Sequence, residues 1–83
     1  MNYTDEEFEE LLITYYKKIG SNVKKARKSK KITQMELARI LNFKAVSSIS
    51  NSEICYDNHH FSLAQLYKIS LALDIDMQEL VQS

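Results

Sequence analysis

The chain is poor in the residues that bend or cross-link a polypeptide. Its 83 residues include no proline, one glycine and one cysteine. Few positions therefore favour a sharp break in a helix, and no run alternates apolar and polar residues as a half-buried β-strand does. The single cysteine excludes an internal disulfide. These absences, with a length that fits one domain, predict a single all-α domain over residues 1–83.

The chain also lacks long apolar runs and an export signal. The apolar run at 11–13 is far too short to cross a membrane. The N-terminus is acidic, whereas a secretory signal begins with a basic segment. A lone cysteine fits a reducing compartment. We expect a cytoplasmic protein with no membrane partner.

Net charge is absent too, because eleven bases balance eleven acids. The charges are unevenly distributed, however. Residues 1–16 hold five acids and no base, residues 17–44 hold ten bases and one acid, and residues 45–83 are acidic again. Neutrality alone argues against a nucleic-acid partner. A basic cluster is the electrostatic pattern of a phosphate-binding surface, although a solvated helix face has the same composition.

The spacing of apolar residues predicts one long N-terminal helix. Thr4 and Glu7 have the spacing of a capping box, in which each side chain satisfies a free amide at the helix start. Apolar residues then recur at steps of three and four from Phe8 to Ala26. This stripe favours a helix over about 5–28.

Gly20 interrupts that stripe, and Ser21 offers a cap for a separate second helix. A glycine inside a helix costs about 1 kcal/mol. Packing against the rest of the domain can offset this cost, so we favour one helix, with or without a bend at Gly20.

Residues 33–53 predict two short helices joined by a tight turn. Thr33 and Glu36 have capping-box spacing ahead of a helix over about 34–41, and Asn42 tolerates the left-handed conformation that ends a helix. A second helix, over about 45–53, turns two apolar residues inward and a row of small polar residues outward. The inward residues are Val46 and Ile49, and the outward residues are Ser47, Ser48, Ser50 and Asn51.

The rest of the chain predicts a loop and two further helices. Residues 54–61 are expected to form the loop. Ser62 is a suitable N-cap for a helix over about 63–73, and Asp76 is a suitable N-cap for a helix over about 77–82. The prediction is therefore five helices in all.

The C-terminal helices contain more apolar residues than one small core obviously needs. Either all of them pack internally, or some form a two-fold dimer seam. These residues are Leu71, Leu73, Ile75, Met77, Leu80 and Val81. Tyr15 and Tyr16 raise the same question, because two adjacent aromatic residues on a helix cannot both face one core.

The order of these features resembles the helix-turn-helix family of phage lambda repressor and Cro, the xenobiotic-response-element class. The Thr-Gln-x-Glu-Leu-Ala string at 33–38 carries most of the resemblance, which covers about residues 16–81. The resemblance implies a five-helix domain that binds double-stranded DNA, usually as a homodimer on two-fold-related half-sites. Residues 1–15 lie outside it and are expected to be an acidic helical extension of the first helix. This extension is a candidate surface for dimer formation or for a protein partner.

The resemblance also implies roles for individual residues. Thr33 and Gln34, at the start of the second helix, would contact a phosphate. The third helix would enter the major groove, where serine and asparagine side chains pair with base edges. Arg27 and Glu53 would form a structural pair that holds this helix to the first. The DNA-contact candidates on and before the third helix are Lys44, Ala45, Ser47, Ser48 and Asn51.

Besides the extension at residues 1–15, the sequence departs from the family pattern in two respects. In the family the residues that match Ala38 and Ile49 are usually ten positions apart, and in this chain they are eleven positions apart. This extra residue leaves open which of residues 44–48 contact DNA. If it lengthens the turn between the second and third helices, Val46 faces DNA. Lys31 and Cys55 occupy positions that often hold glycine, and each costs roughly 1 kcal/mol if its backbone is left-handed.

Other chemistry finds little support in the sequence. Cys55, Asp57, His59 and His60 lack the second pair of ligands that a structural zinc site requires. No nucleophile with a base, and no glycine-rich phosphate loop, is present. We expect no catalysis, metal or cofactor. The sequence predicts a DNA-binding transcriptional regulator, a dimeric repressor or autoregulator at a palindromic operator; the alternative is a protein-interaction module with weak or no DNA binding.

Overall fold

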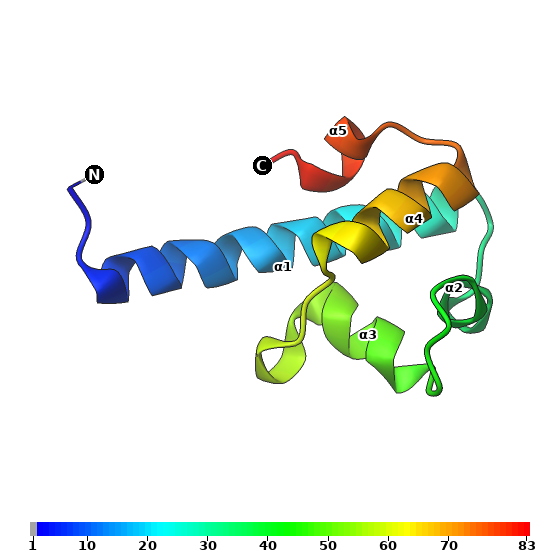
Figure 1. Ribbon diagram of the computed structural model, residues 1–83, viewed down its shortest axis with the longest axis horizontal. Helices are drawn as coiled ribbons and strands as arrows, with labels where there is room; N and C mark the ends of the chain where they lie inside the picture. Colours follow the sequence, from blue (N-terminus) through cyan, green and yellow to red (C-terminus); the bar gives the residue numbers. More distant parts are fainter. Residues whose placement is uncertain (1) are drawn as a thin grey trace.

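One long helix, α1 (Asp5–Ser29), runs along the whole molecule (Figure 1). The computed structural model describes residues 2–83. The C-terminal half of α1 packs against the other helices, whereas its N-terminal half projects from them (Figure 1). The single helix over about 5–28 is therefore confirmed, and no second helix starts at Ser21.

Four shorter helices complete the fold, and the third and fifth helices of the chain make the main contacts with α1. They are α2 (Gln34–Ile40), α3 (Ser47–Ile54), α4 (Leu63–Leu73) and α5 (Met77–Val81), and a short 3₁₀ turn, Tyr56–Asn58, follows α3. Residues 2–83 contain no β-strand, so the all-α prediction with five α-helices is confirmed. No helix in this range is long and apolar enough to span a membrane.

Capping side chains fix where the helices begin. Thr4 and Thr33 each accept a hydrogen bond from the backbone N–H three residues later, and their own backbone N–H groups donate to the carboxylates of Glu7 and Glu36. Ser62 and Gln65 form the same reciprocal pair at the start of α4. These caps satisfy amides that a helix start leaves without partners. Asp76 precedes α5 as expected, but its side chain makes no capping bond.

The core draws one or more fully buried residues from every helix. Burying each such side chain contributes about 1.5–3 kcal/mol. The largest ones are Val23 of α1, Leu37 of α2, Ile49 of α3, Ile69 of α4 and Leu80 of α5. The C-terminal helix is also tied to α1 by Asn22, whose Nδ2 donates to the carbonyls of Leu80 (3.0 Å) and Gln82 (2.8 Å). Thus α5 is an integral part of the core.

Most of the candidate seam residues near the C-terminus are internal. Leu73 and Leu80 are buried, and Ile75, Met77 and Val81 pack against the core. Leu71 is the exception, because the residue is 64% exposed. The surplus of apolar residues therefore reflects the needs of α4 and α5 in the core.

Tyr15 and Tyr16 both find partners within the chain. The hydroxyl of Tyr15 donates to the carbonyl of Val81. The ring of Tyr16 stacks on His60, with centroids 3.7 Å apart and planes 4° from parallel. The two tyrosines contact different segments of the same chain. Contacts within the chain therefore orient both side chains, without a second molecule.

The turn between α2 and α3 is longer than predicted. Helix α3 begins at Ser47 and not near residue 45, so the additional residue is accommodated before the helix. Val46, expected to face inward, is 36% exposed at the N-cap position. That expectation was wrong because Val46 precedes the first helical turn, whereas Ile49 is buried as expected.

Three of the turns use left-handed residues that are not glycine. Lys31, Asn42 and Cys55 have φ values of 59°, 58° and 56°. Asn42 was expected in this conformation, and the family's glycine positions at Lys31 and Cys55 are left-handed as well. A left-handed backbone costs about 1–2 kcal/mol for a residue with a side chain. The core packing on either side holds these turns in place.

Gly20 is required by the crossing of α1 and α3. A Cβ atom at this position would lie 2.4 Å from the Glu53 carbonyl oxygen and 2.6 Å from the Ser52 carbonyl oxygen. Backbone atoms cannot yield as a flexible side chain can. The only glycine of the chain therefore lets the end of α3 approach α1 closely.

Substituting Gly20 by alanine is expected to destabilise the protein, although alanine favours a helix. Overpacking of this kind costs typically about 1–3 kcal/mol. Chemical denaturation of Gly20→Ala measures this loss, with Ser21→Ala on the exposed side of α1 as the control. Equal stability of Gly20→Ala and the parent would contradict the close approach.

The caps also predict a pH dependence. The Thr33 backbone N–H, and then its side chain, lower the pKa of Glu36; Thr4 lowers the pKa of Glu7 in the same way. Because the folded pKa lies below the unfolded one, each cap stabilises the fold at neutral pH and loses this effect as the pH falls through the folded pKa. Thermal unfolding should therefore show a steeper stability loss for the parent than for Glu36→Gln between about pH 5 and pH 3. Glutamine keeps the capping oxygen without titrating, so parallel curves would contradict the prediction.

Candidate nucleic-acid interface

A buried ion pair fixes α3 to α1. Arg27 of α1 donates from Nε to Oε2 of Glu53 at 2.7 Å and from Nη2 to Oε1 at 3.2 Å. Only 7% of the Arg27 side chain and 1% of the Glu53 side chain are exposed. The structure thus contains the pair that the family resemblance implied, in a two-point geometry that sets the orientation of both side chains.

The same pair reaches the start of α2. Arg27 donates from Nη1 to the Ile32 carbonyl at 2.9 Å, and Gln34 donates from Nε2 to Oε1 of Glu53 at 3.1 Å. One carboxylate therefore accepts bonds from α1 and α2 while it belongs to α3. No buried side-chain nitrogen or oxygen within residues 2–83 lacks a hydrogen-bond partner. The hydrogen bonds to Arg27 and Glu53 offset part of the free-energy cost of burying two charges.

Thr33 and Gln34, which the sequence predicted to contact a phosphate, both make hydrogen bonds within the chain. Gln34 is half-buried, and one N–H of its amide is directed to Glu53. Its second N–H and its amide oxygen remain as hydrogen-bonding groups. Thr33 is exposed, but its hydroxyl oxygen accepts the Glu36 N–H at 3.1 Å. Sequence reasoning missed the Gln34–Glu53 bond because it joins residues 19 positions apart.

The polar side of α3 faces away from the core. Ser47 is exposed, and Ser48 and Asn51 are half-buried. Ser47 and Asn51 are four residues apart and share one side of the helix. Ile49, Ser52 and Glu53 form the buried side. Helix α3 therefore presents small hydrogen-bonding side chains on the side opposite its contacts.

The turn before α3 adds further exposed groups. Lys44 and Ala45 are both exposed, as the sequence suggested. Val46 joins them as a residue that the sequence placed inside. At the other end of the helix, Ile54 is 59% exposed and continues the line of Ser47 and Asn51. Ile54 follows Ser47 by seven residues, which is about two helical turns, so the sequence spacing already indicates that both lie on the same side of α3.

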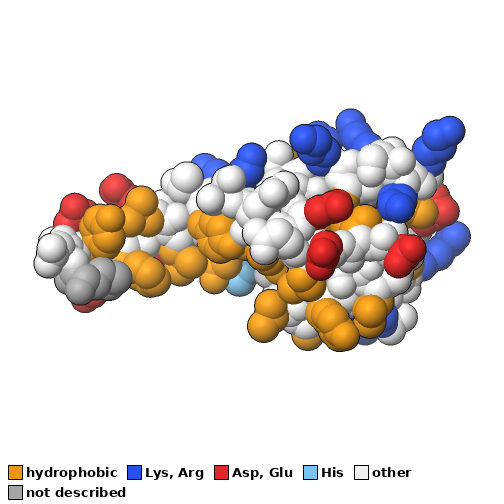
Figure 2. All heavy atoms as spheres, turned by 90° about the horizontal axis from the view of Figure 1, so that it is seen from above, with side chains coloured by type: hydrophobic (Ala, Val, Ile, Leu, Met, Phe, Trp, Pro, Cys, Tyr) orange, Lys and Arg blue, Asp and Glu red, His pale blue; other side chains and the backbone are white. Residues whose placement is uncertain are grey.

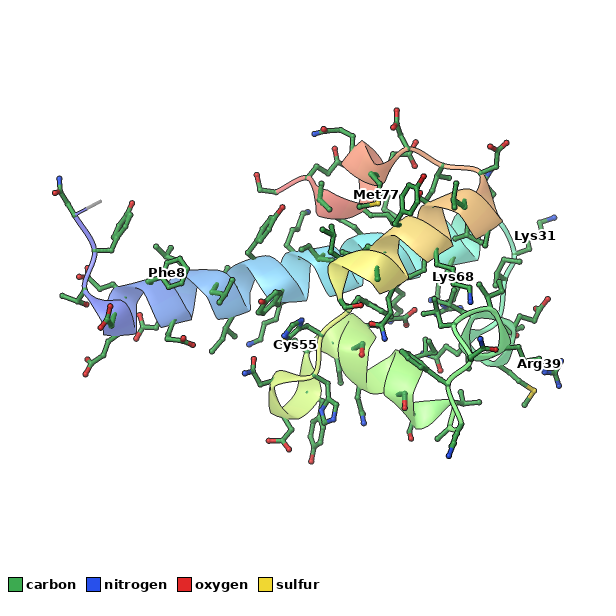
Figure 3. All side chains as sticks on the ribbon, in the orientation of Figure 1. Phe8, Lys31, Arg39, Cys55, Lys68 and Met77 are labelled. Atoms are coloured by element: carbon green, nitrogen blue, oxygen red, sulfur yellow. The ribbon has the colours of Figure 1, made fainter. Side chains whose placement is uncertain are left out.

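Several exposed bases lie at the end of α1, on α2 and in the turns next to α2. Figure 3 shows Lys31 and Arg39 at the end that holds α2, with Phe8 at the opposite end. Figure 2, seen from the side of α4 and α5, shows Lys and Arg side chains along the upper edge and right-hand end of the body, and acidic side chains both on the body and on the projecting end of α1. The exposed bases of this region are Lys28, Lys30, Lys31, Arg39 and Lys44. A polyanion approaching α2 and α3 would therefore meet positive charge.

The cysteine and histidines after α3 serve the fold. Cys55 is buried at the left-handed end of α3. His59 pairs through Nδ1 with the Tyr56 carbonyl at 2.8 Å, and His60 stacks on Tyr16. No group of three or more potential metal ligands is present among residues 2–83.

Removing one partner of the buried ion pair should strongly destabilise the protein. Arg27→Met leaves the Glu53 carboxylate buried without its cation, which typically costs about 3–5 kcal/mol. The double variant Arg27→Met/Glu53→Met removes both charges and should recover part of this loss. Denaturant titration of the parent and the two variants measures the difference. A double variant that is less stable than Arg27→Met would argue against an unpaired charge as the cause.

Comparison with known proteins adds no counterpart for this site. The chain matches no protein-family model, no curated protein and no solved structure. The arrangement at α2 and α3 is thus interpreted from its own residues: a polar helix side, exposed bases on and next to α2 and a buried carboxylate that joins three helices.

Proposed function

We propose that this chain is a sequence-specific DNA-binding regulator of transcription with the helix-turn-helix fold of the lambda repressor and Cro class. The observation that carries the proposal is the position of Glu53. Its carboxylate holds α3 to Arg27 of α1 and to Gln34 of α2, while the opposite side of α3 carries the exposed Ser47 and the half-buried Asn51, with the exposed Ile54 after them. A helix that reads a groove needs such support, because base contacts require a fixed orientation.

In this proposal α3 lies in the major groove with its N-terminal end toward the bases. Asn51 pairs with adenine through its amide, and Ser47 and Ser48 donate to or accept from several bases. Ala45 and the exposed Val46 offer methyl groups to thymine. Helix α3 has no side-chain cap, and the N–H groups of Ser48 and Ile49 donate to the backbone carbonyls of Ala45 and Val46.

Phosphate contacts supply much of the affinity. Lys44 lies in the turn after α2, Lys31 precedes α2, and Arg39 belongs to α2. Gln34 contributes its remaining amide groups at the start of α2. Because each neutralised phosphate releases counterions, binding falls steeply with salt. The acidic half of α1 lies at the far end of the molecule, so it does not oppose this contact (Figure 2).

The proposed biological role is a dimeric repressor or autoregulator at a palindromic operator. A second candidate is a protein-interaction module on the same scaffold. The apolar side chains exposed on the projecting half of α1, Phe8 and Leu11, favour this alternative. The two candidates differ in whether the purified protein selects a DNA sequence.

Selection of bound sequences from a random DNA pool at near-physiological salt should enrich a defined site. Enrichment of a palindrome supports the dimeric regulator, and a pool without enrichment supports the interaction module. The selected site then serves as the probe for variants.

Gln34→Ala and Asn51→Ala should each weaken binding to the selected site by about 5- to 150-fold, which corresponds to about 1–3 kcal/mol per lost contact. Gln78→Ala, an exposed glutamine on α5, is the matched control and should bind like the parent. Thermal unfolding of each variant separates lost contacts from lost stability. If both α2–α3 variants bind as tightly as the control, the proposed surface is wrong.

A further inference from the structure

The projecting half of α1 carries an apolar stripe with little cover from its own chain. We call residues 5–14 the arm. Phe8 and Leu11 are 43% and 50% exposed, and Leu12 is partly exposed. With Tyr15 they recur at steps of three and four, so they lie on one side of the helix. A helix of about ten residues is marginal without packing, and the arm gains its support from the cap at Thr4 and from continuity with the body.

A groove begins where the arm meets the body. Its volume is about 330 Å³, and it lies between α1, the start of α4 and the end of α5. Tyr15 belongs to both the stripe and the groove, so the two apolar surfaces are continuous. Figure 2 shows hydrophobic side chains along one side of the arm and onward to the body. The apolar side chains at the groove include Ile19, Leu63, Leu66 and Val81.

The stripe is symmetric about a point between Leu11 and Leu12. In an antiparallel pair of α1 helices centred there, Leu11 of one copy lies opposite Leu12 of the other. Phe8 of the second copy then lies opposite Tyr15, at the entrance of the groove. A single apolar surface thus offers both the inserted side chain and the groove that receives it.

The charges on α1 favour the same antiparallel arrangement. The acids of α1 lie at residues 5–10, and its first bases are Lys17 and Lys18. Glu7 and Lys18 are eleven residues apart, which is three helical turns, so they border the stripe on the same side. In an antiparallel pair related by a two-fold axis, the same side of each helix faces the other copy. With Leu11 opposite Leu12, Lys18 of one copy lies opposite residue 5 of the other, two residues from Glu7. A parallel pair would place the acids of both copies together.

We propose that the arm stripe and the groove form a two-fold interface between two copies of this chain. The second copy is the occupant because it supplies both the complementary charge and a stripe in matching register. A net charge of zero leaves no overall repulsion between copies. This interface does not depend on DNA binding.

Sedimentation equilibrium of the purified full chain, without DNA, tests the proposal. The parent should dimerise reversibly. Phe8→Glu and Leu11→Glu should each raise the dimer dissociation constant by at least about 30-fold, since both place a charge in the apolar contact. Met35→Glu is the matched control, because Met35 is 52% exposed on α2, away from the arm. A monomeric parent, or a Phe8→Glu variant that dimerises like the parent, would overturn the proposal.

A charge exchange tests the antiparallel register. Glu7→Lys and Lys18→Glu should each dimerise more weakly than the parent, because each brings like charges together twice. An equimolar mixture should form heterodimers more tightly than either variant forms homodimers, since both pairs are then oppositely charged. Glu7 also caps α1, so circular dichroism of each variant records helix content. A mixture that associates no better than its components would overturn the register, and the DNA-pool experiment is unaffected by that result.

Discussion

The arrangement of α1, α2 and α3 depends on the carboxylate of Glu53. Only 1% of the Glu53 side chain is exposed, and its carboxylate accepts hydrogen bonds from Arg27 and Gln34 on two other helices. A buried charge of this kind is weak evidence of stability in itself, because desolvation opposes the attraction. Its effect is on geometry. Three helices must meet at one pair of oxygen atoms, and alternative packings leave a charge without partners.

Gly20 gives this arrangement its second constraint. The carbonyls of Ser52 and Glu53 approach α1 at the one residue that has no side chain. The ion pair and the glycine are seven residues apart on α1, about two turns, so they hold α3 at two levels of the same helix. Together they leave α3 little freedom to rotate, and its polar side keeps a fixed direction.

Local patterns predicted most of the helices, and long-range contacts explain most of what was missed. The capping pairs Thr4–Glu7 and Thr33–Glu36 involve neighbours three residues apart, so the sequence predicted them and the helix starts directly. The Arg27–Glu53 pair came from the family resemblance. Spacing alone did not indicate the inward amide of Gln34 or the stacking of Tyr16 on His60, because each joins distant segments. The exposure of Val46 followed from one additional residue in a turn, whose position a periodic pattern does not locate.

The continuity of α1 links the two ends of the molecule mechanically. An α-helix advances about 100° per residue, so the direction of Phe8 relative to α3 is set by the number of residues between them. Inserting one residue near Thr14 would turn the apolar stripe away from the groove without touching the core. Inserting about eleven would restore the direction and displace the stripe by three turns. The number of residues in this one helix therefore sets the angle about the helix axis between the apolar stripe of the arm and the groove of the body.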